Sequence, residues 1–375
     1  MKHDGGYNRL NIASFLYICF IVVIELIILF LFQNNKVVFA QTIHQTHNYE
    51  NQIIFTFVIC LFSFSKCKFT DFIIRFKIIG YTLLKPALGG NLAEVPFDKL
   101  THINLSFLNP DKSGNFNQNL DGLTSFVEAA HSNNVKVLFS IGGGTVQPQY
   151  HELLKDDKRQ KLIDDLVSNV LKYDIDGIDV DLEEGYAFGS NLDANYGKFI
   201  MELSKVLKSH NKLITVALIS QPANTVTQEV LNEFDFINIM SYDHTGPWMR
   251  NSPPMHHSPY VDARDDLNFY HNTLKLPKEK LILGVPFYGY AFGPKLTDPI
   301  TTWYYNDLIS EYPGAECADY WHLPDDYVLF YNGIPTIKNK TKLAKKEAGG
   351  IMIWQLLFDV SGPKSLLNAI YEAAQ

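Results

Sequence analysis

Three acidic residues alternate with three aliphatic residues in one short stretch of the chain, which reads DGIDVDLE over residues 176–183. The acidic residues are Asp179, Asp181 and Glu183, and the aliphatic residues are Ile178, Val180 and Leu182. Successive side chains of a β-strand point to opposite faces, so the three carboxyl groups share one face at intervals of roughly 6.6 Å. This pattern predicts a strand that packs its aliphatic face on helices and turns a row of acids toward an interior.

A row of enclosed acids retains protons, because burial and neighbouring negative charge both oppose ionisation. A carboxyl group with a raised pKa beside one that stays ionised is the arrangement needed for acid-catalysed cleavage of a glycosidic bond. Glu183 is the last acid of the row, so we expect it at the mouth of the site as the proton donor, with Asp181 and Asp179 deeper. The alternatives are a Mg²⁺ or Ca²⁺ site, which several carboxylates suit, or acids exposed on an edge strand.

Short β-rich apolar segments alternate with longer amphipathic segments over residues 71–375, which predicts parallel strands joined by helices. The expected strands are residues 76–81, 102–107, 135–140, 177–183, 213–218, 236–242, 281–287 and 351–355. The expected helices include residues 123–132, 158–173, 196–210, 265–274 and 338–347. Eight such strands predict an α/β fold, a single (β/α)₈ TIM barrel with its active site at the carboxyl ends of the strands.

Further short motifs lie at the ends of other expected strands. Ser140-Ile141-Gly142-Gly143 ends the third strand, Met240-Ser241-Tyr242-Asp243 ends the sixth, and Trp354 lies on the eighth. In this order they resemble the SxGG, MxYD and tryptophan landmarks of family 18 glycoside hydrolases, the chitinases and their relatives, and residues 176–183 resemble the family signature DGxDxDxE. The resemblance covers about residues 78–372.

The resemblance implies retaining hydrolysis of β-1,4 bonds beside N-acetylglucosamine, in which the substrate's own acetamido group is the nucleophile. Glu183 would be the catalytic acid, and Asp181 would hold the acetamido N–H. Asp179 would share a proton with Asp181, and Tyr242 would bind the acetamido carbonyl. Trp354 would form the floor of the sugar site. The expected substrate is chitin or chito-oligosaccharides, and no cofactor or metal is implied.

Other residues are expected to contribute to sugar binding or to structure. Met240, Asp243 and Gly143 belong to the family motifs and are expected to bind substrate. Trp248, Tyr288, Tyr290 and Trp303 are candidate sugar-stacking platforms, although each aromatic ring could equally belong to the core. Strand parity places Asp176 off the row of acids, so it is interpreted as structural.

The substrate-binding groove is expected to be open and to favour cleavage within the chain. The span of residues 291–349, before the last strand, is interpreted as too short for an added α+β unit that would wall a deep tunnel. An endo-β-N-acetylglucosaminidase acting on N-glycans shares the catalytic motif and remains an alternative. A non-catalytic chitin-binding lectin is a further alternative, although the expected catalytic residues are all present.

Composition and charge argue against several other classes of protein. The net charge of −8 lacks the basic excess of a nucleic-acid-binding protein. Three of the four cysteines, Cys19, Cys60 and Cys67, precede the expected barrel, so only Cys317 lies within it. His256 and His257 are adjacent in sequence, and they are expected to diverge on a loop surface rather than to bind a metal.

The first 70 residues are expected to form a signal peptide or membrane anchor with a linker. Lys2 and Arg9 precede an apolar run over residues 15–32, and cleavage after Ala40 or retention as an anchor are both consistent with this pattern. A second apolar run, residues 53–64, resembles another export signal, and a start codon farther downstream would explain the tandem arrangement. Each version places the enzyme outside the cytoplasm.

Overall fold

The computed structural model describes residues 76–144, 147–183, 195–219, 226–249 and 253–375. The predicted signal or anchor segment, residues 1–70, lies outside these ranges. Among the described residues, no helix is both long and apolar enough to cross a membrane.

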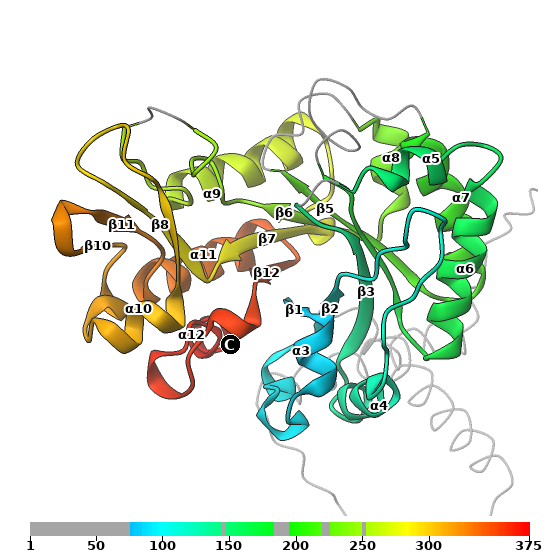
Figure 1. Ribbon diagram of the computed structural model, residues 1–375, viewed down its shortest axis with the longest axis horizontal. Coiled ribbons are helices and arrows are strands. Elements are labelled where there is room, and N and C mark those ends of the chain that lie inside the picture. Colours follow the sequence, from blue (N-terminus) through cyan, green and yellow to red (C-terminus); the bar gives the residue numbers. More distant parts are fainter. Residues whose placement is uncertain (1–75, 145–146, 184–194, 220–225, 250–252) are drawn as a thin grey trace, which may run out of the picture. The chain divides into compact units, whose positions relative to one another are not determined.

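Eight parallel strands close into a barrel, which confirms the predicted (β/α)₈ fold (Figure 1). The strands are β1 (Lys77–Leu83), β2 (His102–Ser106), β3 (Lys136–Gly142), β4 (Gly177–Asp181), β5 (Leu213–Ile219), β6 (Phe236–Met240), β7 (Leu281–Pro286) and β12 (Gly350–Trp354). They follow chain order around the barrel, and β12 closes it between β7 and β1. The carboxyl ends of all eight strands therefore lie at one mouth.

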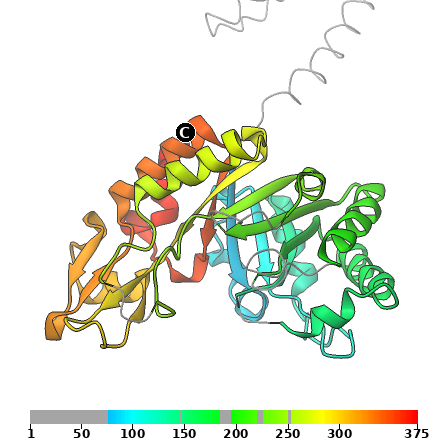
Figure 2. The same ribbon diagram turned by 90° about the horizontal axis from the view of Figure 1, so that it is seen from above.

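Helices cover the outside of the barrel, as Figure 2 shows for the C-terminal half. They are α3 (Leu84–Gly89), α4 (Leu123–Ser132), α5 (Gln149–Leu153), α6 (Arg159–Lys172), α7 (Tyr196–Ser209), α8 (Gln228–Glu233), α9 (Tyr260–Asn268), α11 (Ile334–Glu347) and α12 (Leu366–Ala374). The five predicted helices are present. Helix α9 begins five residues before the predicted position 265, and Phe269–Thr273 continues it as a π-helical turn.

Strand β4 has the two-faced structure that its sequence predicts. Ile178, Val180 and Leu182 are buried in the large apolar cluster that also contains residues of the covering helices α6 and α7. Because alternate side chains point the other way, Asp179 and Asp181 face the barrel interior, where both are almost completely buried. The aliphatic packing of one face thus fixes the direction of the acids on the other.

Asp176 lies at the amino end of β4, and its structural interpretation is confirmed. Its Oδ2 accepts a hydrogen bond from the backbone N–H of Val137 at 2.8 Å and contacts Nε2 of His131 at 2.8 Å. The Asp176 backbone N–H also donates to the Val137 carbonyl at 2.7 Å. Asp176 therefore braces β3 and helix α4 against β4, at the end of the barrel away from the mouth.

The span between β7 and β12 contains an added α+β unit, so the prediction that it is too short for one is wrong. A four-stranded antiparallel sheet has the order β10-β11-β8-β9. Its strands are β8 (Tyr288–Phe292), β9 (Thr301–Tyr304), β10 (Tyr320–His322) and β11 (Val328–Phe330), with helix α10 (Tyr305–Glu311) between β9 and β10. The unit fits into this short span because its strands have only three to five residues. Little chain is used for connection, since β8 starts two residues after β7 ends.

The expectation of a surface position for the tandem histidines is also wrong. His257 is fully buried and His256 is half-buried. Their rings do not diverge but stack, with 5.9 Å between centroids and 11° between planes. Within the described ranges, no group of His, Cys, Asp and Glu side chains is arranged to hold a metal ion. The histidines instead belong to a buried polar network beside the barrel mouth.

Gly177 offers a test of the close approach of β4 to β5. A Cβ atom at this position would lie 2.2 Å from the backbone oxygen of Leu213 on β5. We expect Gly177→Ala to lower the free energy of unfolding by about 1–3 kcal/mol, because the two strands must separate. Gly89→Ala is the matched control, since a Cβ there meets nothing within 4 Å. Urea denaturation of both variants measures the difference, and equal stability would contradict the proposed clash.

Candidate active site

The acids of β4 lie at the centre of the barrel mouth, at increasing height along one strand. Asp179 is fully buried and Asp181 is 3% exposed, whereas Glu183, two residues farther, is only half-buried. The carboxyl group of Glu183 lies against Gly144, where an added Cβ would come within 3.2 Å of Oε1. The predicted gradient from a deep acid to an accessible acid is therefore present.

Asp179 accepts four hydrogen bonds from side chains of four other strands. Its Oδ2 accepts from Tyr81 Oη at 2.6 Å and from Ser140 Oγ at 2.8 Å. Its Oδ1 accepts from Thr215 Oγ1 at 2.6 Å and from Asn238 Nδ2 at 3.1 Å. Burial raises the pKa of Asp179, and the hydrogen bonds oppose that effect. The four donors thus stabilise a carboxylate in a position that water does not reach.

Asp181 has the opposite environment, because its Oδ1 is buried and has no hydrogen-bond partner in the described part of the chain. Burial, the charge of Glu183 and the charge of Asp179 raise the pKa of Asp181 well above its ordinary value. An unpaired buried oxygen costs free energy, about 1–3 kcal/mol when nothing compensates it. Asp181 therefore presents a polar atom that a ligand's hydrogen-bond donor would satisfy.

The glycine turn after β3 fits against the end of β4. Gly142 and Gly143 have φ angles of 100° and 99°, in the region that favours glycine. A Cβ on Gly142 would lie 2.3 Å from the Asp181 carbonyl oxygen, which accepts a hydrogen bond from the Gly143 N–H at 2.7 Å. A Cβ on Gly143 would overlap the ring of Phe107 at 2.5 Å. Gly143 therefore allows Phe107 to approach the mouth; its direct contact with substrate stays a prediction.

Tyr242 and Met240 line the same interior at the end of β6. Both side chains are buried, and Tyr242 Oη lies 3.9 Å from the sulfur of Met352. Burial raises the pKa of Tyr242 well above its ordinary value, and so do the charges of Asp181, Asp243, Glu183 and Asp179. The Tyr242 hydroxyl therefore keeps its proton and can donate a hydrogen bond, because the negative charges of these four acids oppose its ionisation.

Trp354 lies beside the acids, at the end of β12. Its ring is 5.5 Å from the ring of Tyr81, and it stacks with Phe107 at 5.9 Å and 26°. The ring is half-buried, so part of its surface remains available to a ligand. The Ser106–Phe107 and Trp354–Gln355 peptide bonds are both cis. Trp354 therefore has a partly exposed ring near Tyr81 and Phe107, and its role as the floor of the sugar site stays a prediction.

The other candidate sugar-stacking residues differ in exposure: Tyr288 and Tyr290 are buried, whereas Trp248 is exposed. Tyr288 and Tyr290 are each only 6% exposed, and both hydroxyls donate to Oδ1 of Asp243, at 2.6 and 3.0 Å. Their interpretation as stacking platforms is therefore wrong, because their rings are packed and their hydroxyls support Asp243. Trp248 is 55% exposed and contacts Tyr290 edge to face, so it can stack on a sugar. Trp303 packs against Tyr312 in the inserted unit.

Comparisons with known proteins agree with this arrangement. The profile of glycosyl hydrolases family 18 matches residues 78–359, which include every acid and aromatic residue described above. This chain belongs to glycosyl hydrolase family 18. The family is one of glycosidases, and the predicted class of enzyme is therefore confirmed.

Solved structures of family 18 chitinases have the same fold. The chitinase ChiB from the chitin utilization locus of Flavobacterium johnsoniae is 32% identical, with a TM-score of 0.70 over 80% of this chain and 94% of that one. A chitinase from Bacteroides thetaiotaomicron is 29% identical, with a TM-score of 0.66 over 80% of this chain and 96% of that one.

One curated relative of this chain is described as chitinase-like rather than as a chitinase. A "chitinase-like effector" of Moniliophthora roreri is 29% identical over 55% of this chain and 57% of its own length. The first curated relatives are matched over only 42–57% of their own lengths.

Sequence reasoning assigned no role to the individual residues that support the family 18 acids from other strands, although Ser140 belongs to the motif that ends the third strand. Tyr81, Ser140, Thr215 and Asn238 bind Asp179, and Phe107 stacks on Trp354. Each of the four polar residues interrupts an apolar strand segment, and this was the available signal. Their convergence on one carboxylate depends on the register between strands, such as Ser140 opposite Asp179.

The raised pKa of Asp181 predicts a pH-dependent stability difference for Asp181→Asn. Above pH 4 the unfolded chain loses a proton that folded Asp181 retains, so the stability of the parent falls as the pH rises. Because Asn cannot ionise, we expect the free energy of unfolding of the variant, relative to that of the parent, to be higher at pH 7 than at pH 4. Urea denaturation at both pH values measures this. A constant difference, or a gain that is larger at pH 4, would contradict the prediction.

Proposed function

We propose that this family 18 chain hydrolyses β-1,4 bonds beside N-acetylglucosamine, in chitin or chito-oligosaccharides, with retention and with help from the substrate's acetamido group. The observation that carries this proposal is the buried Oδ1 of Asp181, between Asp179 and Glu183, which has no hydrogen-bond partner among the described residues. An acetamido N–H is a donor of the kind that this acceptor lacks. Three solved or curated relatives described above are named chitinases or chitinase-like, which supports the substrate class.

In the first step, Glu183 donates its proton to the oxygen of the leaving sugar, and the bond from that oxygen to the anomeric carbon breaks. The acetamido oxygen of the remaining sugar forms a new bond to the same carbon, which gives a cyclic oxazolinium ion. Asp181 accepts the acetamido N–H and stabilises the positive charge that develops. The half-buried position of Glu183, above two buried acids, suits a donor that must reach the leaving group.

In the second step, water attacks the anomeric carbon and Glu183 takes up the proton that this water releases. The oxazolinium ring opens, so the acetamido group is regenerated and the carbon has been inverted twice, which retains its configuration. Asp179 carries part of the negative charge beside Asp181, because its four hydrogen-bond donors stabilise it as a carboxylate. The Tyr242 hydroxyl donates to the acetamido oxygen, and Trp354 lies beneath the sugar ring.

The groove is proposed to accept the polymer along its length, with cleavage within the chain. The exposed Trp248, at the edge of the mouth, would stack on a sugar beyond the reacting one. The added α+β unit between β7 and β12 removes the argument for an open groove that its expected absence provided. Initial products of mixed length from a soluble chitin polymer would support cleavage within the chain, and disaccharide as the dominant product from the first minutes would contradict it.

The proposal is tested with the full chain and its Glu183→Gln variant, each incubated with chitotetraose and with a high-mannose glycoprotein. We expect the parent to release shorter N-acetylglucosamine oligomers, and kcat of the variant to fall by about 10²–10⁴-fold, because Gln cannot transfer the proton. Mass spectrometry identifies the products. Glutamine preserves the shape of Glu183, so a loss of activity at unchanged Tm reports the proton rather than the fold.

Two other outcomes would overturn the proposal in different ways. Release of whole glycans that leave one N-acetylglucosamine on the protein would assign the chain to the endo-β-N-acetylglucosaminidases. Binding of chitotetraose without hydrolysis of either substrate would indicate a lectin.

We also propose that the enzyme acts outside the cytoplasm. The support is the basic start and the apolar run of residues 15–32. Fractionation of cells that express the full chain with a C-terminal tag would give activity in the medium or on the outer membrane surface; activity confined to the cytosol would contradict this location.

A further inference from the structure

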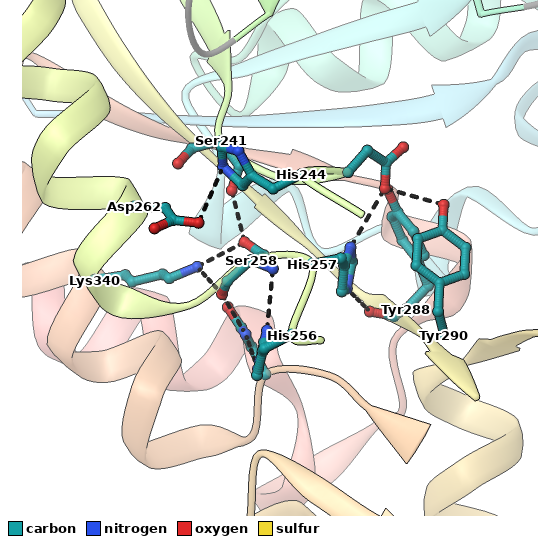
Figure 3. A network of polar contacts seen from close by, with 11 residues as sticks. Ser241, His244, His256, His257, Ser258, Asp262, Tyr288, Tyr290 and Lys340 are labelled. Carbon is teal, nitrogen blue, oxygen red and sulfur yellow. Dashed lines mark hydrogen bonds and ion pairs between the residues drawn. The ribbon is translucent and has the colours of Figure 1, made fainter. Parts of the chain in front are cut away.

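Asp243, the last residue of the family motif after β6, is held by a buried polar network rather than by the acids of β4. Figure 3 shows His257, Tyr288 and Tyr290 of this network. Its side chain is 38% exposed, and Oδ1 is the atom that binds the network. That oxygen accepts from the hydroxyls of Tyr288 and Tyr290, and Nδ1 of His257 lies 3.3 Å from it. His257 itself is fully buried.

The partners of His257 favour a proton on each ring nitrogen, because both partners are hydrogen-bond acceptors. Nε2 lies 3.2 Å from the backbone carbonyl oxygen of Tyr288, which can only accept a hydrogen bond, so Nε2 carries a proton. Nδ1 faces Oδ1 of Asp243, which is also an acceptor. One additional proton must therefore lie between Nδ1 and Oδ1, or two lone pairs would face one another in a buried site.

The adjacent His256 provides an internal contrast. Its Nε2 lies 2.6 Å from the Tyr331 carbonyl oxygen, whereas its Nδ1 accepts a hydrogen bond from the Ser258 N–H at 3.0 Å. One acceptor and one donor match a neutral imidazole, and burial lowers the pKa of His256 to about 3. The two rings stack, yet only His257 faces two acceptors.

The position of His257 is fixed by bonds between its loop and the motif on β6. Ser258 Oγ donates to the Ser241 carbonyl at 2.6 Å, and the His244 N–H donates to the His257 carbonyl at 3.1 Å. The buried Lys340 on α11 donates to Ser258 O and Oγ, each at 2.7 Å (Figure 3). Hydrogen bonds to the motif after β6 and to Lys340 on α11 therefore hold the loop that carries His257.

We propose that His257 is a positioning residue for the reaction proposed above, which shares a proton with Asp243 and thereby holds this carboxylate toward the barrel mouth. The inference rests on the proposed function. It assigns a pH-dependent role to a pair outside the row of β4 acids. When the shared proton is lost, the lone pair of Nδ1 repels Oδ1, and Asp243 loses the His257 contact while it keeps the hydrogen bonds from Tyr288 and Tyr290.

The charged and titratable groups around His257 determine where the proton is lost. They come from four directions: Asp243 after β6, His256 in the same loop, Tyr288 and Tyr290 on β8, and Lys340 on α11. Burial lowers the pKa of His257, Asp243 opposes this effect, and Lys340 adds to the lowering. We therefore expect the shared proton to contribute to the alkaline limb of the activity profile.

The test compares His257→Asn with His257→Gln in the full chain. An Asn side chain places an amide N–H at the position of Nδ1, so it still donates to Asp243 but cannot titrate. A Gln side chain places its amide N–H near Nε2 and retains only the contact with the Tyr288 carbonyl. We expect kcat/KM on chitotetraose to fall about 10- to 100-fold in H257Q, the loss that follows from removing a hydrogen bond to a charged group.

The pH profile separates positioning from a structural role. We expect H257N to keep most of the activity and to move the alkaline limb of kcat/KM to higher pH, because the titrating ring is gone. H256N is the matched control and should leave that limb in place. Equal losses in H257N and H257Q, with an unchanged limb, would overturn the proposal.

A measurement that does not need activity separates this proposal from the proposed function. Long-range ¹H–¹⁵N spectra of the labelled chain, with the His257 signal assigned by its loss in H257N, report protonation of each ring nitrogen. We expect protons at both nitrogens in the acidic range, and an unprotonated Nδ1 throughout would overturn the inference. If the parent cleaves neither substrate, the proposed function fails, while these spectra still test the shared proton.

Discussion

The row formed by Asp179 and Asp181 on the inward face of β4, with Glu183 just beyond the end of the strand, is the constraint on which the site depends. Placing Asp179 and Asp181 in an interior without water is costly, because burial raises the pKa of both, and the charges of Glu183 and Asp179 raise that of Asp181 further. The barrel offsets this cost unevenly. Asp179 has four donors, whereas Asp181 has an oxygen without a partner in the described chain. This asymmetry leaves one acid stabilised by protein and another available to a ligand.

Close packing around the barrel mouth keeps the neighbouring residues in contact with the acids. Glycines in the turn after β3 allow the Asp181 carbonyl and the Phe107 ring to approach within distances that a side chain would prevent. Phe107 in turn stacks on Trp354, whose far neighbour Tyr81 donates to Asp179. The Tyr81 ring thus contacts Trp354 while its hydroxyl binds the deepest acid, Asp179.

The second polar cluster, around Asp243, shows how the added α+β unit participates in the site. Tyr288 and Tyr290 lie on β8 of that unit, and their hydroxyls bind Asp243 at the end of β6. His257 and Lys340 extend the cluster to the loop before α9 and to α11. An element that reads as an insertion between two barrel strands therefore supplies the support for a motif residue of the barrel itself.

The sequence alone determined the fold class, the row of acids and the direction in which the acids point. Acidic and aliphatic residues alternate along residues 176–183 with a period of two, which a strand satisfies and a helix does not. The aliphatic face of that strand must pack against helices. Tertiary structure alone decided which groups surround each acid, because Tyr81, Ser140, Thr215 and Asn238 meet at Asp179 only through the register of four separate strands. It also decided the burial of His257 and the presence of β8–β11, since short strands and a polar loop carry too weak a local pattern to reveal their long-range partners.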